Sequence, residues 1–551
     1  MKSEYVTTMI SFLGGLGMFI YGLNIMAEGL QKSAGARMKN MLGVLTKNKL
    51  LAVLAGAAVT AIIQSSAGTT IMVVGFVNAG IMTLLQATGV IMGANIGTTI
   101  TSWLVSMNQW GSFFRPQYIA PIFVCISAFI MLISKQEKKR MIGEIMFGFG
   151  ILFIGFGTMN AAVRIYAQYD PFLKVSRFFG SNPFICIITG IIITALLQSS
   201  SVSVGIVQAL AVNRLVNFQA AVFITLGQNI GTCVTALISS AGTQKTAKRA
   251  AVIHLLFNVT GAFVFGIAIF IVFQFVPSLA GVYVNSIDVS LIHTIFNVSC
   301  TLLLFPFMNV LVKTSGWIVG SHDQENEDND VQIAVRHLDK RLLESPSVAV
   351  AEVSYEVVHM GEVAYETAKL AFDAIITRDG RKAKEVFEKE KSIDEMTDVI
   401  SDYLVKISSL SLTEEQHTTI TNLFYTVSNF ERMGDHSENL AELCRYMIEN
   451  DIYFSQPAYK ELEGIMEIVT NSFVYSIRSR RDLSAESAKR AKGYENLVDQ
   501  IEEELRKKHM MRLANELCKP TSGVVFLDIL SNLERISDHA DNVAGYVLDE
   551  L

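Results

Sequence analysis

Residues 60–66 of the chain are Thr60-Ala-Ile-Ile-Gln64-Ser65-Ser66, and the same pattern returns 134 positions later as Thr194-Ala-Leu-Leu-Gln198-Ser199-Ser200. A second block repeats with the same shift, as Gly93-Ala-Asn95-Ile-Gly97-Thr98 and Gly227-Gln-Asn229-Ile-Gly231-Thr232. Upstream, Gly17-Met-Phe-Ile-Tyr-Gly22 matches Gly150-Ile-Leu-Phe-Ile-Gly155 at a shift of 133. Three blocks at nearly one shift indicate an internal duplication. We predict two repeats, over about residues 11–135 and 144–312.

The composition changes sharply near residue 320. Up to Gly320 the chain holds 19 Lys and Arg against 6 Asp and Glu, whereas the remainder holds 26 against 45. None of these four residue types occurs between Leu50 and Val105, and such long apolar stretches are typical of membrane spans. We predict a transmembrane domain over residues 1–320, an acidic linker over 321–330 and a soluble domain over 331–551.

Several apolar runs of the first domain are too short to cross a bilayer. The runs that end at Gln64 and Gln198 fall short of the roughly 20 residues that a crossing helix needs. Because a broken helix at membrane depth must face protein or a watery cavity, we expect re-entrant hairpins with the Gln-Ser-Ser turns at their tips. The apolar runs lie at about 8–29, 50–63, 69–86, 88–107, 117–134, 143–162, 183–197, 202–212, 217–239, 250–276 and 289–312.

Basic residues predict the orientation of the repeats, because they gather in cytoplasmic loops. The loops expected inside carry Lys32, Arg37, Lys39, Lys47 and Lys49, then Lys135, Lys138, Lys139 and Arg140, and finally Lys245, Lys248 and Arg249. The loop with Arg164, Lys174 and Arg177 then lies outside, because a single helix over about 142–162 precedes it. The two repeats are therefore expected to be inverted, as in many secondary transporters whose site lies at the repeat interface.

The repeated polar residues are the candidate binding residues. Interrupted helices present N-terminal N–H groups that favour an anion, and carbonyls and hydroxyls that can coordinate sodium. For any single hydroxyl the alternative is helix packing or a bond to the backbone, but the recurrence of the whole pattern favours one shared site. The candidates are Gln64, Ser65, Ser66, Thr69, Thr70, Asn95, Thr98, Thr99, Gln198, Ser199, Ser200, Ser201, Ser203, Asn229 and Thr232.

A smaller repetition lies inside the later apolar runs. His254-Leu-Leu-Phe-Asn258 and His293-Thr-Ile-Phe-Asn297 share the same order of polar residues. Polar side chains within membrane spans usually face protein or a water-filled cavity. We favour interhelical hydrogen bonding by these residues over a role in proton coupling.

The pair of Gln-Ser-Ser segments resembles the type II sodium-dependent phosphate cotransporters, whose hallmark is an inverted pair of Gln-Ser-Ser-Ser segments. The second copy, Gln198-Ser199-Ser200-Ser201, matches fully, whereas Ala67 replaces the third serine in the first copy. The departure puts the contribution of position 67 in question. The resemblance covers nearly all of residues 8–312, and it implies inorganic phosphate as substrate, sodium as the driving ion and a homodimer.

From about Val331 onward, long amphipathic patterns rich in Glu, Lys and Ala predict a helical bundle, so we expect an all-α chain. Four Glu-x-x-x-Asp pairs each place two carboxylates on one helical face, where like charges repel. We predict that divalent or ferric ions bind between them. The alternative is a solvated acidic face neutralised by Arg432 and Arg535. The predicted ligands are Glu390, Asp394, Glu431, Asp435, Glu495, Asp499, Glu534 and Asp538.

Two of these pairs belong to a duplicated Glu-Arg-x-x-Asp-His block, at residues 431–436 and 534–539. Tandem bundles with this signature resemble the PhoU family, regulators of phosphate uptake that can bind metal ions. Together the two resemblances imply a non-enzymatic, sodium-driven phosphate importer of the bacterial inner membrane, with a PhoU-like cytoplasmic domain. We expect membrane lipid but no nucleic acid among its partners.

Three other functions stay open from the sequence. The chain could transport another oxyanion such as sulfate or arsenate, because these offer similar oxygens. The Asp435-His436 and Asp538-His539 pairs could belong to a metal-dependent phosphohydrolase tethered to the membrane. A phosphate-signalling protein that has lost transport is the third alternative.

Overall fold

The computed structural model describes residues 2–34, 48–110, 116–320 and 330–551. Within these ranges every regular element is helical, and the sole bridge between extended residues joins Asn217 and Tyr283. The all-α prediction is confirmed. The chain forms two compact units, Met1–Glu325 with Asp339–Val348, and Asn326–Leu338 with Ala349–Leu551. Except for Asp330, the predicted linker lies outside the described residues, as do Arg37, Lys39 and Lys47 of the first predicted inside loop.

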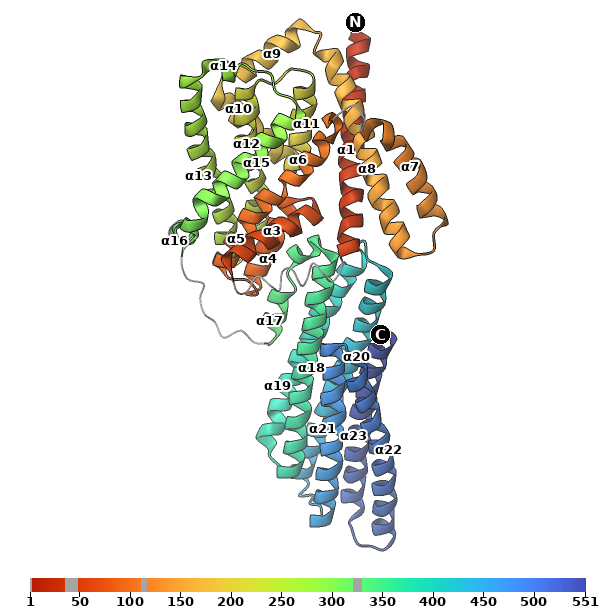
Figure 1. Ribbon diagram of the computed structural model, residues 1–551. Coiled ribbons are helices and arrows are strands. Elements are labelled where there is room, and N and C mark those ends of the chain that lie inside the picture. The colour runs from red at the N-terminus through yellow and green to blue at the C-terminus, as the bar shows by residue number, and fades with distance from the viewer. Residues whose placement is uncertain (1, 35–47, 111–115, 321–329) are drawn as a thin grey trace. The chain divides into compact units, whose positions relative to one another are not determined.

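Among the described residues of the first unit, six helices or helix pairs are long and apolar enough to cross a membrane. Shorter helices of 13 to 15 residues, α3, α4, α10 and α11, alternate with them. The main helices are α1 (Lys2–Ala34), α3 (Lys49–Ile63), α4 (Ser66–Asn78), α5 (Leu84–Gly97), α6 (Thr99–Ser106), α7 (Pro116–Ile133), α8 (Glu137–Tyr166), α9 (Asp170–Ser181), α10 (Pro183–Leu197), α11 (Ser200–Val212), α12 (Phe218–Ser239), α13 (Lys245–Phe275), α15 (Ser286–Leu304) and α16 (Met308–Val319) (Figure 1).

Three features of this unit differ from the apolar runs of the sequence. The run over 69–86 divides, because α4 ends at Asn78 and Gly80 turns the chain with a φ of 74° before α5 begins. The run over 88–107 breaks at Thr98 into α5 and α6. The segment with Lys174, expected as a loop, contains helix α9, which Pro at its first turn helps to begin.

Glycine contacts repeat together with the sequence blocks. A Cβ added to Gly56 of α3 would lie 2.2 Å from the Val90 carbonyl of α5, and one added to Gly190 of α10 would lie 2.3 Å from the Ile224 carbonyl of α12. All four positions are related by the same 134-residue shift. Glycine thus lets each hairpin pack directly against the backbone of the helix that follows it.

The second unit is a bundle of long helices that run side by side (Figure 1). Stacked rings of Phe430 and Phe473 lie in its core, with centroids 6.3 Å apart. Arg480 and Glu550 form a buried two-pronged ion pair, with Nη2 and Oε2 2.7 Å apart. The helices are α17 (Asp330–His337), α18 (Pro346–Thr377), α19 (Gly380–Ser408), α20 (Glu414–Glu449), α21 (Gln456–Asp482), α22 (Ala485–Ala514) and α23 (Pro520–Asp549), and the first three residues of α18 belong to the first unit.

Candidate functional site

Each repeat contains a helical hairpin whose turn is a Gln-Ser dipeptide. Gln64 has φ 56° and ψ 20°, and Ser65 is extended with φ −143° and ψ 110°. The equivalent residues Gln198 and Ser199 have φ 52° and ψ 21°, then φ −144° and ψ 111°. Left-handed backbone is uncommon at non-glycine residues. Its recurrence at both glutamines shows that the duplicated sequence folds into the same turn twice.

The serine of each turn caps the helix that follows. Ser65 Oγ accepts a hydrogen bond from the Gly68 amide at 3.0 Å, and Ser199 Oγ accepts one from the Val202 amide at 3.3 Å. A serine at this position satisfies one of the free N–H groups of the first helical turn. The other first-turn amides of α4 and α11 keep the positive end of the helix dipole at the turn.

A second pair of equivalent bonds fixes the two arms of each hairpin. Thr60 Oγ1 donates to Thr69 Oγ1 at 2.9 Å, and Thr194 Oγ1 donates to Ser203 Oγ at 2.9 Å. All four side chains are at most 1% exposed. The two threonines at the starts of these bonds were not among the predicted binding residues, although they open the repeated seven-residue motif.

The two hairpins meet at their tips. Ser66 Oγ and Ser200 Oγ lie 3.4 Å apart, and both side chains are buried. These serines are the first residues of α4 and α11, so two helix N-termini point toward one hydroxyl pair. Converging N-termini without a basic side chain favour an anion. The same hydroxyl oxygens can also coordinate a hard cation such as sodium.

Two side chains that the sequence did not single out brace this centre. Gln228 Nε2 of α12 donates to Ser203 Oγ at 2.8 Å, and Thr101 Oγ1 of α6 donates to Gln64 Oε1 at 2.9 Å. Gln228 directly precedes the repeated Asn-Ile-Gly-Thr motif, but its equivalent in the first copy is Ala94, so the repeat did not point to it. Gln198, in contrast with the partly buried Gln64, is exposed.

The predicted Asn and Thr residues outside the turns bond to their own helices. Asn95 Nδ2 donates to the Ile91 carbonyl at 2.8 Å, and Asn229 Nδ2 donates to the Thr225 carbonyl at 2.9 Å. Side chains of this group that donate to the carbonyl three or four residues earlier are Thr70, Thr98, Thr99 and Thr232. Ser201 is buried beside Ser200. The hydrogen bonds of these Asn and Thr side chains therefore follow the alternative given above, in which a polar side chain bonds to the backbone of its own helix.

The repeated His and Asn residues of α13 and α15 also bond within their helices. Asn258 Nδ2 donates to the His254 carbonyl at 3.1 Å, and Asn297 Nδ2 donates to the His293 carbonyl at 2.8 Å. Two interhelical contacts to Cys233 of α12 accompany them. Asn258 Nδ2 donates to Cys233 Sγ at 3.4 Å, and Cys233 Sγ donates to the His254 carbonyl at 3.5 Å. The contacts to Cys233 agree with the prediction of interhelical bonds for His254 and Asn258, whereas the bond that Asn297 Nδ2 donates stays within α15.

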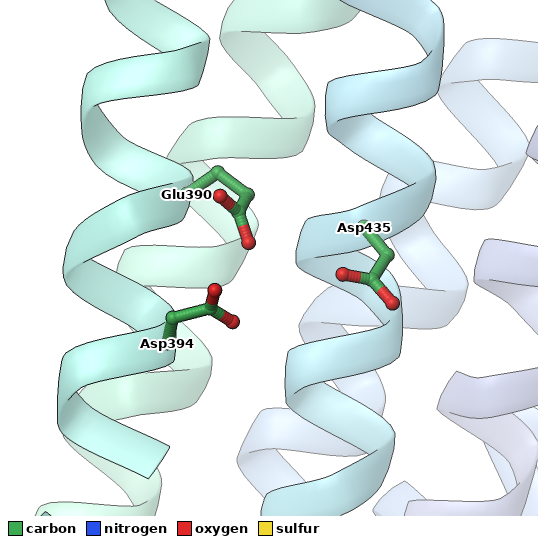
Figure 2. Close-up of side chains that lie close together, drawn as sticks. All are labelled: Glu390, Asp394 and Asp435. Atoms are coloured by element: carbon green, nitrogen blue, oxygen red, sulfur yellow. The ribbon is translucent and has the colours of Figure 1, made fainter. Parts of the chain in front are cut away.

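In the second unit, carboxylates of α19 and α20 gather in one place. Glu390, Asp394 and Asp435 each offer an oxygen within 4.8 Å of the others, and Figure 2 shows the three carboxyl groups facing one another. Burial and the nearby charges of Asp394, Glu438 and Asp435 raise the pKa of Glu390 to about 7. Three converging oxygens from two helices are an arrangement that can hold a hard cation.

The second half of the bundle repeats this arrangement on α22 and α23. Glu495, Asp499 and Asp538 offer oxygens within 4.8 Å of one another. Burial, together with Asp499, Asp541 and Asp538, raises the pKa of Glu495 to about 7. Glu438 and Asp541 act on these groups through their charge and were not among the predicted ligands, although each lies two residues after a copy of the duplicated Glu-Arg-x-x-Asp-His block.

The remaining predicted ligands, Glu431 and Glu534, fall outside the two close groups. Burial and the neighbouring aspartate raise the pKa of each of them. The two arginines of the acidic-face alternative lie at the side of the groups, since Arg432 Nη1 is 3.5 Å from Asp435 and Arg535 Nε is 3.6 Å from Glu534. Among the described residues, neither arginine lies within 4 Å of Glu390 or Glu495.

The two histidines of the duplicated block link the halves of the bundle. His436 Nδ1 lies 2.9 Å from Asn532 Oδ1, and His539 Nδ1 lies 2.9 Å from Asn429 Oδ1. The two rings are stacked with centroids 5.6 Å apart. Burial and the nearby His436 lower the pKa of His539 to about 4. In this arrangement each Nδ1–H donates to an asparagine and not to a carboxylate.

Comparison with known proteins agrees with both parts of this description. Residues 18–161 and 167–280 match the family model described as Na+/Pi-cotransporter, and residues 357–444 and 462–547 match the PhoU domain. The putative inorganic phosphate export protein YjbB of Escherichia coli is 22% identical over 550 residues, which cover 98% of each chain.

Two further relatives match parts of the chain. Human sodium-dependent phosphate transport protein 2B is 37% identical over 107 residues, or 19% of this chain and 15% of that protein. The phosphate-specific transport system accessory protein PhoU homolog 1 of Thermotoga maritima is 26% identical over 189 residues, or 33% of this chain and 78% of that protein. The chain therefore belongs to the Na+/Pi-cotransporter family, a family of phosphate transporters and not of enzymes, and carries a C-terminal PhoU domain.

Proposed function

We propose that the protein imports inorganic phosphate by coupling it to sodium, with phosphate bound between the tips of the two hairpins. The observation that carries this proposal is the 3.4 Å approach of Ser66 Oγ and Ser200 Oγ at the starts of two helices. Two helix N-termini supply N–H groups for the phosphate oxygens. The surrounding hydroxyls and the broken backbone supply oxygens for sodium.

We further propose that the two repeats have opposite orientations in the bacterial inner membrane. Movements of the repeats then open the site to one face of the membrane at a time. The basic loops favour a cytoplasmic C-terminal domain. The long apolar helices support insertion in a membrane, and the resemblance to the type II cotransporters supports a homodimer. Sodium dependence draws support from the name of the human relative, which is 37% identical over the matched 107 residues.

Export of phosphate is the second candidate, because the relative that matches over the whole chain is named a putative phosphate export protein. A sodium-coupled transporter runs in either direction, and the ion gradients decide which one. The direction of transport therefore depends on the gradients, and flux measurements under defined gradients distinguish the two candidates.

Uptake of labelled phosphate into proteoliposomes tests the proposal. We expect an inward sodium gradient to drive accumulation, and potassium in its place to abolish it. Excess sulfate should leave the flux unchanged, whereas competition by sulfate would indicate a broader oxyanion transporter. Phosphate efflux that does not depend on sodium would contradict import and support export. The Gln64→Ala and Gln198→Ala variants should lose nearly all flux while still inserting in the membrane.

We also propose that divalent or ferric ions bind the two carboxylate groups of the PhoU domain. The support is the convergence of three oxygens in each half and the raised pKa of Glu390 and Glu495. Elemental analysis of the purified chain, after loading with manganese or iron and removal of excess, should give metal that the Asp435→Asn/Asp538→Asn variant lacks. Asp482→Asn, which changes an exposed carboxylate elsewhere in the bundle, is the matched control. Equal metal content in all three proteins would refute the two sites.

A further inference from the structure

A short segment, Asp339–Val348, belongs to the first unit although it follows the start of the second along the chain. We call these ten residues the latch. The chain enters the latch from Leu338 and leaves it into Ala349, and both of these neighbours belong to the second unit. The latch is therefore a segment that lies between two parts of the second unit along the chain but folds with the transport unit.

One end of the latch is fixed to the C-terminal end of α4 in the first repeat. Asp339 Oδ2 accepts a hydrogen bond from Asn78 Nδ2 at 2.7 Å. The same asparagine accepts a bond from the Gln244 amide, at the start of α13 in the second repeat, through its Oδ1 at 3.1 Å. Asn78 thus connects the latch, the first hairpin and the loop that follows α12.

A second residue of the latch, Arg341, bonds to the second repeat. Arg341 Nε donates to the Ser239 carbonyl, the last residue of α12, at 2.7 Å, and its Nη2 donates to the Ala241 carbonyl at 3.3 Å. Asp339 holds the guanidinium in this position through a 2.7 Å ion pair with Nη1. A cation bound to free carbonyls at a helix C-terminus is favourable.

The middle of the latch is part of the hydrophobic core of the unit. Leu342 is fully buried in a cluster with side chains of α4 and α13, including Val73 and Ala250. A Cβ added to Gly75 of α4 would lie 3.0 Å from Leu342 Cδ2 and 3.1 Å from Arg341 Cβ. Glycine at this position lets the latch lie directly on α4. Because removal of a leucine side chain from water is favourable, the latch is attached by apolar packing as well as by hydrogen bonds.

The far end of the latch reaches the turn of the first hairpin. A Cβ added to Gly68 would lie 3.6 Å from Glu344 Oε2 and 3.4 Å from Ser65 Oγ. The Glu344 carboxylate therefore lies against the first turn of α4, beside the serine that caps it. The side chain is exposed on its other side. An exposed glutamate thus places its carboxylate beside the helix N-terminus to which we assign phosphate.

We propose that the latch is an inhibitory segment, which holds α4 and α12 together and places the Glu344 carboxylate in the path of phosphate. This inference rests on the proposed function of the hairpin site. Alternating access requires elements of the two repeats to separate at each end in turn, and the latch joins them at one end. A negative carboxylate beside the anion site also repels phosphate.

The continuity of the chain makes the PhoU domain the controller of the latch. α18 begins with the last three latch residues and continues into the bundle as its first long helix. On the other side, His337 of α17 hydrogen-bonds Glu356 of α18 within the second unit. Both ends of the latch are therefore fixed to the bundle, so a displacement of α18 moves the latch residues.

Phosphate flux of the full chain in proteoliposomes tests the latch with two variants. Glu344→Gln removes the charge with little change of shape, and it should lower the phosphate KM several-fold. Asp339→Asn loosens the ion pair with Arg341 without touching the hairpin turn, and it should raise the maximal rate. Glu385→Gln, at an exposed glutamate of α19, is the matched control and should leave both parameters unchanged.

Hydrogen exchange of residues 339–348 in the same proteins reports on the latch independently of flux. We expect slow exchange in the wild type and faster exchange in Asp339→Asn. Wild-type transport with an unchanged KM in Glu344→Gln and an unchanged rate in Asp339→Asn would overturn the latch. Absence of phosphate flux in every protein, together with faster exchange in Asp339→Asn, would instead contradict the proposed function and leave the latch attached as described.

Discussion

Gln228 of the second repeat stands where Ala94 stands in the first, and its Nε2 donates to Ser203 Oγ at 2.8 Å. The hairpins are therefore equal in backbone but unequal in polar support. Ser201 and its equivalent Ala67 differ in the same direction. Thr70 and its equivalent Val204 differ in the opposite direction, so residues 60–70 and 194–204 carry five hydroxyl side chains each. The second hairpin is therefore distinguished by the additional bond from Gln228, not by a larger number of hydroxyls.

We predict that Ser203→Ala impairs transport more than Thr69→Val. Ser203 Oγ accepts bonds from both Thr194 and Gln228, so its loss leaves two buried donors unpaired, at a cost of about 1–3 kcal/mol for each donor. Thr69 Oγ1 accepts a single bond from Thr60. Sodium-driven phosphate flux and the thermal stability of the purified variants measure the difference. Equal effects would show that Gln228 adds nothing to the hairpin.

Cysteine accessibility should reveal the predicted inversion. Ala241 and Gly281 are exposed at the two ends of α13, and Gly281 has a φ of −88° that any residue can adopt. After Cys125 and Cys518 are replaced by serine, an impermeant maleimide should label Ala241→Cys only from the cytoplasm and Gly281→Cys only from outside. The reverse pattern would overturn the orientation derived from the basic loops.

The metal-free PhoU domain should become less stable as pH rises from about 4.5 to 7. The pKa of Glu390 and of Glu495 is about 7 in the folded chain, against an ordinary value of 4.5, so the folded state binds more protons over this interval. The expected loss is on the order of 1–2 kcal/mol for each carboxylate after solvent screening.

Melting of a fragment over residues 346–551 in EDTA, followed by circular dichroism at several pH values, measures this loss. The Glu390→Gln/Glu495→Gln double variant is the control, and its stability should vary much less between pH 5 and 8. A wild-type fragment that gains stability over this interval would contradict the assignment, because the two carboxylates would then ionise more readily in the folded state.

The buried pair of Arg480 and Glu550 gives a prediction for the bundle core. Arg480→Ala leaves a buried carboxylate without its partner, and we expect it to destabilise the fragment by about 3–5 kcal/mol. The double variant Arg480→Met/Glu550→Leu should recover much of the loss, since neither charge remains buried. Melting of the same fragment provides the comparison. A double variant as unstable as Arg480→Ala would show that packing, and not the unpaired charge, is lost.

The hairpins could be predicted because a short apolar run and a duplicated Gln-Ser turn occur together, and both depend only on local sequence. The bracing by Gln228 could not, since Ala94 interrupts the repeat at that position and the bond joins two helices. Leu342 also resembles an ordinary apolar position of an amphipathic helix. Its attachment to α4 depends on tertiary packing against Gly75, which no periodicity reports.

In the carboxylate groups, the spacing of Glu390 and Asp394 identified one helical face but not its partner. Asp435 joins that face because α19 and α20 pack side by side, whereas Glu431, one turn earlier, does not reach it. The direction in which a residue points around its helix decides whether it joins the carboxylate group. A four-residue spacing shows that two residues share a face, but it does not show which neighbouring helix that face contacts.

The exchanged bonds between His436 and Asn532, and between His539 and Asn429, have a consequence for assembly. Each half of the bundle supplies one histidine and one asparagine, and each needs the complementary pair from the other half. Two separate polypeptides, one ending after α20 and one beginning with α21, should therefore recognise each other in a single alignment. The two halves of the bundle should therefore associate like two subunits, although one chain contains both.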